Sequence, residues 1–133
     1  MNGIKKTTAI NPKQILMVTD PHVSVSVVVG NTDVTAGEDG KKILKAGTPL
    51  SGDLTARNTA FVKAKTTTGL EESPDTSNAV GVLLHDVDVT DGNNNGSLLI
   101  FGFVNLDRLD ATTAGLIDDA AKAALSGKIT FLK

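Results

Sequence analysis

The strict alternation of residues in His22–Val29 (HVSVSVVV) constrains the fold of this chain more than any other feature of the sequence. Three of its valines would lie on one face of an extended backbone, and two serines and a further valine on the other. β-Branched residues with a period of two are typical of a strand that packs one face against a core. We therefore predict a β-strand here.

Four further segments are predicted as strands. Ser97–Leu106 is apolar on both faces, which is typical of a central strand that is covered on both sides. Asn78–Val89 begins apolar and ends acidic, so we expect it to leave the core or to bulge near His85–Asp86. Shorter strands are expected at Lys41–Leu44 and Lys128–Leu132.

One helix is predicted, at Thr112–Leu125, where apolar residues recur along a single stripe. Asp118 and Asp119 lie in its first half and Lys122 in its second, which suits the helix dipole. Gly127 follows as a natural stop signal.

Together these elements predict a mainly β fold of the α+β kind, namely a small β-barrel or β-sandwich-like domain with one C-terminal helix. A length of 133 residues fits one domain. Residues 1–20 are expected to form an extended N-terminal arm, and residues 21–133 a single β-rich domain. Thr66–Asn78, which is rich in Thr, Ser, Glu, Gly and Pro, is expected to be an exposed mobile loop.

The composition argues against several classes of function. Aromatic residues make up 3% of the chain, with no Trp and no Tyr, so neither a carbohydrate site nor a platform for single-stranded nucleic acid is expected. A net charge of −2 gives no general attraction for phosphate backbones, which argues against direct nucleic-acid binding. The absence of cysteine excludes disulfides and thiolate metal sites. No long apolar run suggests a signal peptide or a membrane anchor, so we expect a soluble protein made in the cytoplasm.

Asp91–Gly96 (DGNNNG) fits the first half of a calcium-binding loop, with oxygen ligands at positions 1, 3 and 5 and glycine at position 6. Position 12 would be Gly102, where a bidentate Glu is needed, and predicted strands flank the segment instead of helices. Asn and Gly suit a β-hairpin turn equally well, because both tolerate positive φ. The turn is the favoured interpretation.

His85, Asp86 and Asp88 are candidates for a metal or acid–base cluster, to which Asp91 and His22 could contribute from elsewhere in the chain. On one regular strand Asp86 and Asp88 would point to one side and His85 to the other, so the three would not converge. The sequence contains no nucleophile elbow, phosphate loop or dinucleotide-binding fingerprint. We therefore predict that the chain is not an enzyme and that it binds no metal and no cofactor.

Two segments resemble the head decoration proteins of phages: Lys45–Leu50 (KAGTPL) and Ala79–Val89 (AVGVLLHDVDV). In that family a Gly-Thr-x-Leu turn precedes a strand of the type Ala-Val-Gly-Ile/Val-Leu-Leu with acidic residues. A glycine-containing strand with Val-Asn follows, here Gly102–Asn105. The tail, Leu106–Leu109 and Ala120–Leu132, is similar to head-fibre and decoration proteins of phages that infect Gram-positive bacteria. The resemblance covers residues 41–133 and rests on strand patterns and turns.

This resemblance implies a structural protein of the virion, located on the outer capsid surface, that stabilises the head or forms the base of a head fibre. It implies the major capsid protein as the partner, a homotrimer as the oligomer, and synthesis in the host cytoplasm. The alternative is another phage binding module, such as a tail or baseplate component or a host-surface adhesin.

Two sets of candidate contact residues follow from these expectations. An extended arm can add a strand to the sheet edge of another protein. Capsid contacts are therefore expected at Lys5, Lys6, Ile10, Ile15, Leu16 and Val18. Contacts between subunits are expected at Phe103, Asp107 and Arg108, although a surface ion pair is the simpler interpretation of the two charged residues.

Overall fold

The computed structural model describes residues 14–71 and 73–133, and most of its regular structure is β. The described helices are a short 3-10 segment, η2 (Leu106–Arg108), and two α-helices, α1 (Ala111–Gly115) and α2 (Asp119–Ala124). The expected mainly β fold is confirmed. The described strands are β1 (Leu16–Val29), β2 (Ile43–Leu44), β3 (Pro49–Ser51), β4 (Val62–Lys63), β5 (Thr66–Thr67), β6 (Thr76–Ser77), β7 (Gly81–Leu83), β8 (Val87–Asp88), β9 (Asn94–Asn105) and β10 (Ile129–Leu132).

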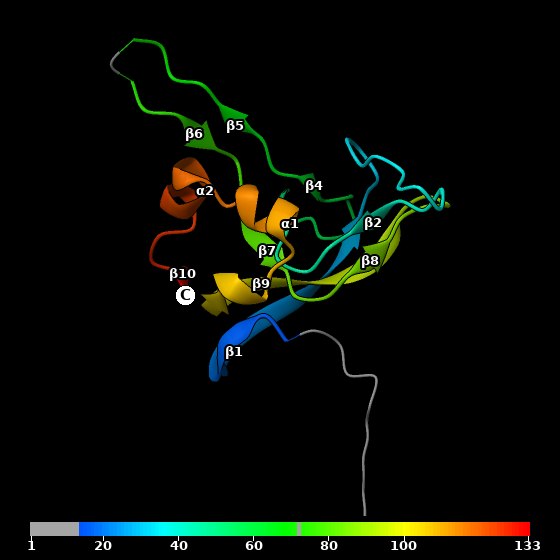
Figure 1. The fold of residues 1–133 in the computed structure, drawn as a ribbon, viewed down its shortest axis with the longest axis horizontal. Helices are drawn as coiled ribbons and strands as arrows, with labels where there is room; N and C mark the ends of the chain where they lie inside the picture. The colour runs from blue at the N-terminus through cyan, green and yellow to red at the C-terminus, as the bar shows by residue number, and fades with distance from the viewer. Residues whose placement is uncertain (1–13, 72) are drawn as a thin grey trace, which may run out of the picture.

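Six of the described strands form one sheet, in the order β1-β9-β7-β3-β4, with β10 also paired to β9 (Figure 1). Two small two-stranded sheets, β2 with β8 and β5 with β6, complete the described β-structure. The strand pairs are antiparallel except for β10 with β9, which is parallel. These sheets are open and do not close into a barrel.

The strand predicted at His22–Val29 is confirmed as the second half of β1, which pairs with β9 along almost its whole length. The register of this pair shifts between Val18 and Val23. Pro21, which has no N–H to donate, therefore lies at an irregularity of the ladder, where proline is tolerated. Residues 16–20 of the predicted arm thus belong to the sheet. The first 13 residues of that arm lie outside the described residues.

The large sheet separates two apolar clusters. Leu99 of β9 and its partner Val82 of β7 face one cluster, whereas the next pair, Leu98 and Leu83, faces the other. All four side chains are fully buried. Strand β9 is therefore covered on both faces at this point, as its apolar pattern predicted.

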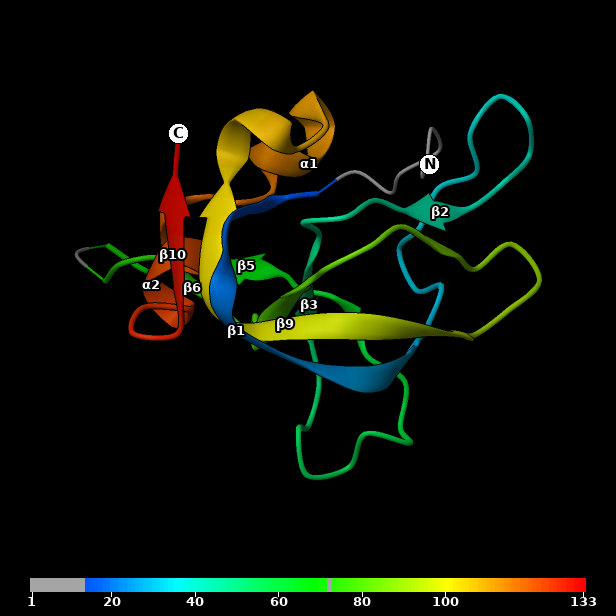
Figure 2. The same ribbon diagram turned by 90° about the horizontal axis from the view of Figure 1, so that it is seen from below.

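Strand β9 also changes direction along its length, and β10 joins only its last part (Figure 2). Gly102 lies where β10 begins to pair and has a φ of 156°, a value that favours glycine. A Cβ atom there would lie 3.3 Å from the Cβ of His22. The missing side chain thus permits the bend and the close approach of β1.

The predicted C-terminal helix is present, but it is split into α1 and α2. Helix α1 ends at Gly115, and the backbone of Asp118 is extended, with φ −84° and ψ 179°. Its Oδ1 accepts the N–H of Ala121 at 2.8 Å, so Asp118 acts as the N-cap of a new helix. The prediction of one continuous helix was wrong because the apolar stripe runs across the break: Ile117 and Leu125 are both buried.

The strand predicted at Asn78–Val89 leaves the large sheet where expected. Strand β7 ends at Leu83, and β8 begins at Val87 and pairs with β2 in a different sheet. Between them the carboxylate of Asp86 accepts the N–H of Ala46 at 2.7 Å, which holds the crossing segment in place.

The segment Thr66–Asn78, predicted as a loop, forms a hairpin on β5 and β6 that projects from the body of the molecule (Figure 1). The side chain of Asn78 closes its base by accepting the N–H of Lys65 at 2.8 Å. Leu70, near the tip, is 83% exposed.

Candidate functional site

The described chain begins with an anchored segment, Gln14–Leu16. The side chain of Ile15 is fully buried. The carbonyl of Ile15 accepts the N–H of Asn105 at 2.8 Å, and the carbonyl of Gln14 accepts a hydrogen bond from Nη1 of Arg108 at 3.2 Å. The chain therefore enters the domain at a fixed point, next to the end of β9.

The six residues predicted to contact the capsid differ in their positions in the structure. Ile15 and Leu16 belong to the apolar core of the chain itself. Val18 lies in β1, where its backbone pairs with Phe103. The other three predicted contacts lie outside the described residues: Lys5, Lys6 and Ile10. Because core side chains cannot also form a contact surface, Ile15 and Leu16 are not available for a capsid contact.

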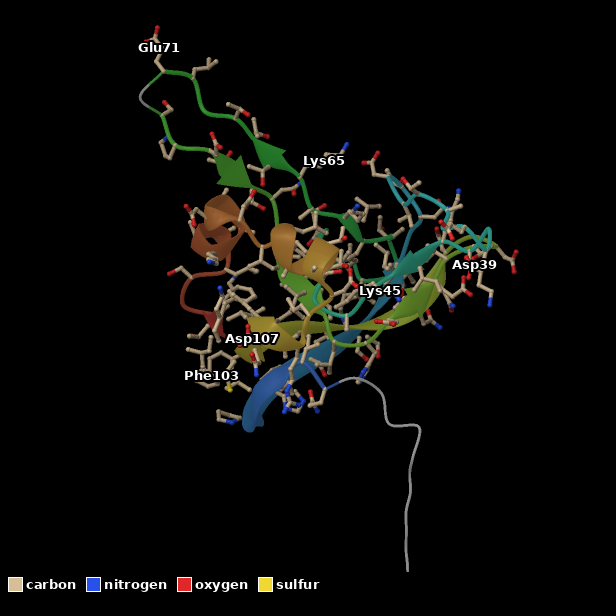
Figure 3. The ribbon with its side chains drawn as sticks, in the orientation of Figure 1. Asp39, Lys45, Lys65, Glu71, Phe103 and Asp107 are labelled. Atoms are coloured by element: carbon tan, nitrogen blue, oxygen red, sulfur yellow. The ribbon has the colours of Figure 1, made fainter. Side chains whose placement is uncertain are left out.

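The three predicted subunit contacts lie close together at one end of β9. Figure 3 shows Phe103 and Asp107 on the side of the molecule opposite the loop of Asp39. Phe103 is half-buried, and the following η2 segment exposes Asp107 and Arg108. Oδ1 of Asn105 accepts the N–H of Asp107 at 3.0 Å and thereby caps this segment.

Two ion pairs join described side chains. Nζ of Lys45 lies 3.9 Å from Oδ2 of Asp86, and Nζ of Lys65 lies 3.1 Å from Oδ2 of Asp33. The four side chains are 51% to 68% exposed, so each pair contributes about 0–1 kcal/mol to stability. Neither pair involves Asp107 or Arg108. The guanidinium of Arg108 instead donates to the backbone carbonyl of Gln14.

A row of apolar side chains, which we call the outer apolar face, lies on adjacent strands β1, β9 and β10. Val23 and Phe101 are direct partners across β1 and β9. Phe103 pairs with Thr130 of β10. Leu132 lies two residues further along β10 and pairs with Asn105. Four members are substantially exposed, at 37% to 48%, and Phe103 is half-buried. The outer apolar face consists of Met17, Val23, Phe101, Phe103 and Leu132.

Exposure distinguishes these side chains from their neighbours in the core. Leu16 and its partner Val104 are buried, whereas Met17 is exposed and Phe103 is half-buried. Phe131 pairs with Val104 and packs against the same core, which turns Leu132 outward. Of these five residues, only Phe103 was predicted to form a contact, because an apolar strand pattern does not show which face remains uncovered.

The acidic and histidine candidates do not form a site. Asp86 is engaged by the N–H of Ala46 and by Lys45. Asp88 accepts hydrogen bonds from the hydroxyl of Thr90 at 2.6 Å and from its N–H at 2.9 Å, and these bonds hold the pKa of the Asp88 carboxyl below its usual value. Within residues 14–71 and 73–133, no three His, Cys, Asp or Glu side chains are grouped so that they could hold a metal ion.

The turn interpretation of Asp91–Gly96 is confirmed. The N–H of Gly92 bonds the carbonyl of Val89 at 3.2 Å, and Gly92 has a φ of 128°. Strand β9 already begins at Asn94, whose side-chain amide donates to the carbonyl of Asp88 at 3.0 Å. Gly92 and the side chain of Asn94 thus serve the turn between β8 and β9, whereas Asn95 and Gly96 pair within the strand.

Two of the surface depressions on the described part of the chain are large enough for a small ligand. One, of about 510 Å³, lies between β1 and the segment 55–58, where Nη1 of Arg57 donates to the carbonyl of Ser26 at 3.0 Å. The other, of about 420 Å³, lies between the hairpin and α2 and is lined by Pro74, Asp75, Asp118, Asp119, Ala120 and Ala123. The first lining holds hydroxyl groups but no carboxylate or histidine. In the second, Asp75 accepts the N–H of Gly69 and Asp118 accepts the N–H of Ala121, so both carboxylates serve the fold.

No helix in the described parts of the chain is long and apolar enough to cross a membrane. A scan against protein-family models finds no match for this chain, and no curated protein matches it either.

Proposed function

We propose that this chain is a structural, non-enzymatic virion protein that binds the outer surface of a phage capsid. It decorates and stabilises the head, or forms the base of a head fibre. The observation that carries the proposal is the anchored entry of the chain at Gln14–Leu16. A segment that attaches a protein to a shell must transmit force to the folded domain. Here Nη1 of Arg108 donates a hydrogen bond to the carbonyl of Gln14, and the N–H of Asn105 donates one to the carbonyl of Ile15.

The charge distribution of the sequence also supports a binding role for the N-terminal segment. Residues 1–13 contain Lys5, Lys6 and Lys13 and no acidic residue. A basic segment favours an acidic partner surface and raises the association rate. The proposed partner is the major capsid protein, and the resemblance of residues 41–133 to decoration proteins supports this choice. In a homotrimer three such segments would act together, which strengthens a weak single contact.

A sedimentation experiment tests the proposal. Purified protein is mixed with undecorated phage heads, the heads are pelleted, and the bound copies per head are measured. We expect saturable binding, with three copies at each local threefold position. Absence of binding at concentrations of about 10 µM would contradict the proposal. Binding to isolated tails or to host cells would then favour the tail or adhesin alternative.

A truncation locates the contact. Removal of residues 1–13 keeps Gln14 and the buried Ile15, so the folded domain is expected to keep its circular dichroism spectrum and melting temperature. The truncated protein is expected to lose binding to heads. The matched control replaces three lysines outside the segment, Lys122, Lys128 and Lys133, by alanine, which removes the same charge. Unchanged binding after truncation would show that the segment is not the contact.

A further inference from the structure

We infer that a third surface depression, between β2 and α1, binds an aliphatic carboxylate, meaning a compact apolar group that carries one carboxylate. This β2–α1 depression has a volume of about 290 Å³. Four parts of the chain that are distant in sequence meet around it: the loop after β1, the segment from β2 to β3, strand β4, and α1 with its flanking residues. The inference goes beyond the proposed capsid contact and does not depend on it.

The buried polar side chains of the protein are the first argument. Among the side chains whose burial the structure describes, only two polar ones are buried, Thr48 at 2% exposure and Thr113 at 4%. Both line the β2–α1 depression. The hydroxyl of Thr48 donates to the carbonyl of Lys45 at 2.7 Å, and its oxygen can still accept a hydrogen bond.

The hydroxyl of Thr113 differs from that of Thr48, because no described residue forms a hydrogen bond with it. A buried polar group without a partner in the protein is rare, and it lowers stability unless water or a ligand bonds it. The depression therefore contains one polar position that the described chain leaves unsatisfied and that a bound molecule can satisfy.

The charge of the lining is the second argument. Lys45, Lys63 and Asp110 line the depression, so its charge is two minus one, or +1, although the net charge of the chain is −2. The contacts of both ammonium groups within the chain are long. Nζ of Lys45 lies 3.9 Å from Oδ2 of Asp86, and Nζ of Lys63 lies 3.5 Å from the carbonyl oxygen of Asp33. An ammonium group has three N–H donors and binds a carboxylate more strongly than a neutral acceptor.

The carboxylates around the depression do not cancel this positive charge. Asp33 pairs with Lys65 at 3.1 Å, and Asp86 accepts the N–H of Ala46 at 2.7 Å. Asp110 is exposed, so water screens its charge. A carboxylate on a ligand therefore finds two cations with donors available.

The remaining lining is aliphatic, which is the third argument. Leu44 is buried, Val34 and Ile43 are partly buried, and Leu116 after α1 is 36% exposed. The described lining contains no aromatic side chain on which a base or a sugar could stack. A volume of about 290 Å³ lies at the lower limit of ligand pockets, so the ligand is small. An aliphatic group with one carboxylate complements both halves of the lining.

An NMR titration tests the inference on the full chain. The probe is isocaproate, and its neutral amide, isocaproamide, is the matched control ligand. Isocaproate is expected to shift the amide resonances of lining residues such as Thr35, Lys45 and Thr113. The shifts should saturate with a dissociation constant of about 1 mM, as suits so small a ligand. Isocaproamide is expected to bind about 10-fold more weakly, because it lacks the charge that the lysines bind.

Three variants separate this site from the general charge of the chain. Lys63→Met removes the ammonium group, and Thr113→Val removes the hydroxyl while keeping the shape of the side chain. Each is expected to weaken isocaproate binding about 5-fold or more. Lys128→Met is the control, since it removes the same charge at an exposed position outside the depression, and it should leave the affinity unchanged. Thr113→Val should also keep or raise the melting temperature, because the hydroxyl that it removes has no partner.

Saturable shifts confined to the lining, together with weaker binding by Lys63→Met and Thr113→Val, support the inference. The absence of saturable shifts at about 20 mM isocaproate overturns it, and so does equal binding of the acid and its amide. A lower melting temperature of Thr113→Val also overturns it, since the hydroxyl would then already have a partner in the free protein. A second titration with acetyl-Gly-Gly-Leu identifies the source of the carboxylate. Tighter binding than isocaproate assigns the site to the carboxyl terminus of a peptide, and weaker binding assigns it to a free acid; both results support the inference.

Discussion

The hydroxyl of Thr66 donates a hydrogen bond to Oδ2 of Asp118 at 2.8 Å and so joins two segments that are 52 residues apart. Oδ1 of the same carboxylate accepts the N–H of Ala121 at 2.8 Å. One side chain therefore caps α2 and holds the base of the β5–β6 hairpin against it. These bonds lower the pKa of Asp118, the Ala121 N–H contributing most and the Thr66 hydroxyl next.

Replacement of Asp118 tests this double role. Asp118→Ala is expected to lower the free energy of unfolding by about 1–2 kcal/mol, because the helix loses its N-cap. Thr66→Val removes only the bond to the hairpin and is expected to cost about 0.5–1 kcal/mol. Urea unfolding measures both. Asp119→Ala is the control, since it removes a neighbouring charge without a cap, and a loss as large as that of Asp118→Ala would argue against the cap.

Stability is expected to fall as the solution becomes acidic. The pKa values of Asp53, Asp88 and Asp118 lie below the usual value of 3.8, because hydrogen bonds from Thr55, Thr90 and Ala121 respectively favour the charged carboxylates. A lowered folded-state pKa contributes stability above the unfolded value, and this contribution is lost as the pH falls through the folded value. Melting temperatures should therefore be steady above about pH 5 and drop below about pH 4. Asp118→Asn should reduce that drop, and an unchanged pH profile would contradict the assignment.

Gly47 and Gly40 form a matched pair of glycines with positive φ. A Cβ on Gly47, at φ 96°, would overlap Cδ2 of Leu109, whereas one on Gly40, at φ 78°, meets nothing within 4 Å. Gly40→Ala is expected to cost about 1–2 kcal/mol for the left-handed backbone alone. Gly47→Ala adds about 1–3 kcal/mol of overpacking. Chemical denaturation compares them, and Leu109→Ala should partly rescue Gly47→Ala. Equal costs would show that the core accommodates the extra methyl group.

Among the residues that the structure describes, Phe61 is the only aromatic side chain that is fully buried. Its N–H bonds the carbonyl of Val28 at 2.7 Å, so the ring is held beside β1 in the second apolar cluster. Phe61→Ala is expected to lower the free energy of unfolding by about 3–5 kcal/mol, because it leaves a cavity. Leu70→Ala, at an exposed position, should change it by less than about 0.5 kcal/mol. Similar effects of the two variants would mean that the core around Phe61 collapses to fill the space.

Local patterns predicted the individual elements well where the pattern is complete within a few residues. The alternation of His22–Val29 and the two apolar faces of Ser97–Leu106 both correspond to strands. The acidic end of Asn78–Val89 marked the point where the chain changes sheets. The extent of the C-terminal helix was predicted less well. The N-cap residue Asp118 is also bound by the hydroxyl of Thr66, and a pattern confined to residues 112–125 cannot show this distant contact.

The sequence alone determined that the chain is mainly β and that β9 is central, because these properties depend on side-chain type and period. Only the tertiary structure decided which apolar residues are covered. Ile15 and Leu16 are core residues because Ile117, Leu125 and Ile129 from the other end of the chain belong to the same cluster. Phe101, which follows the buried Leu99 by two residues on the same strand β9, remains exposed. Burial depends on which distant segments reach a face after the sheet bends, and a local pattern carries no information about that.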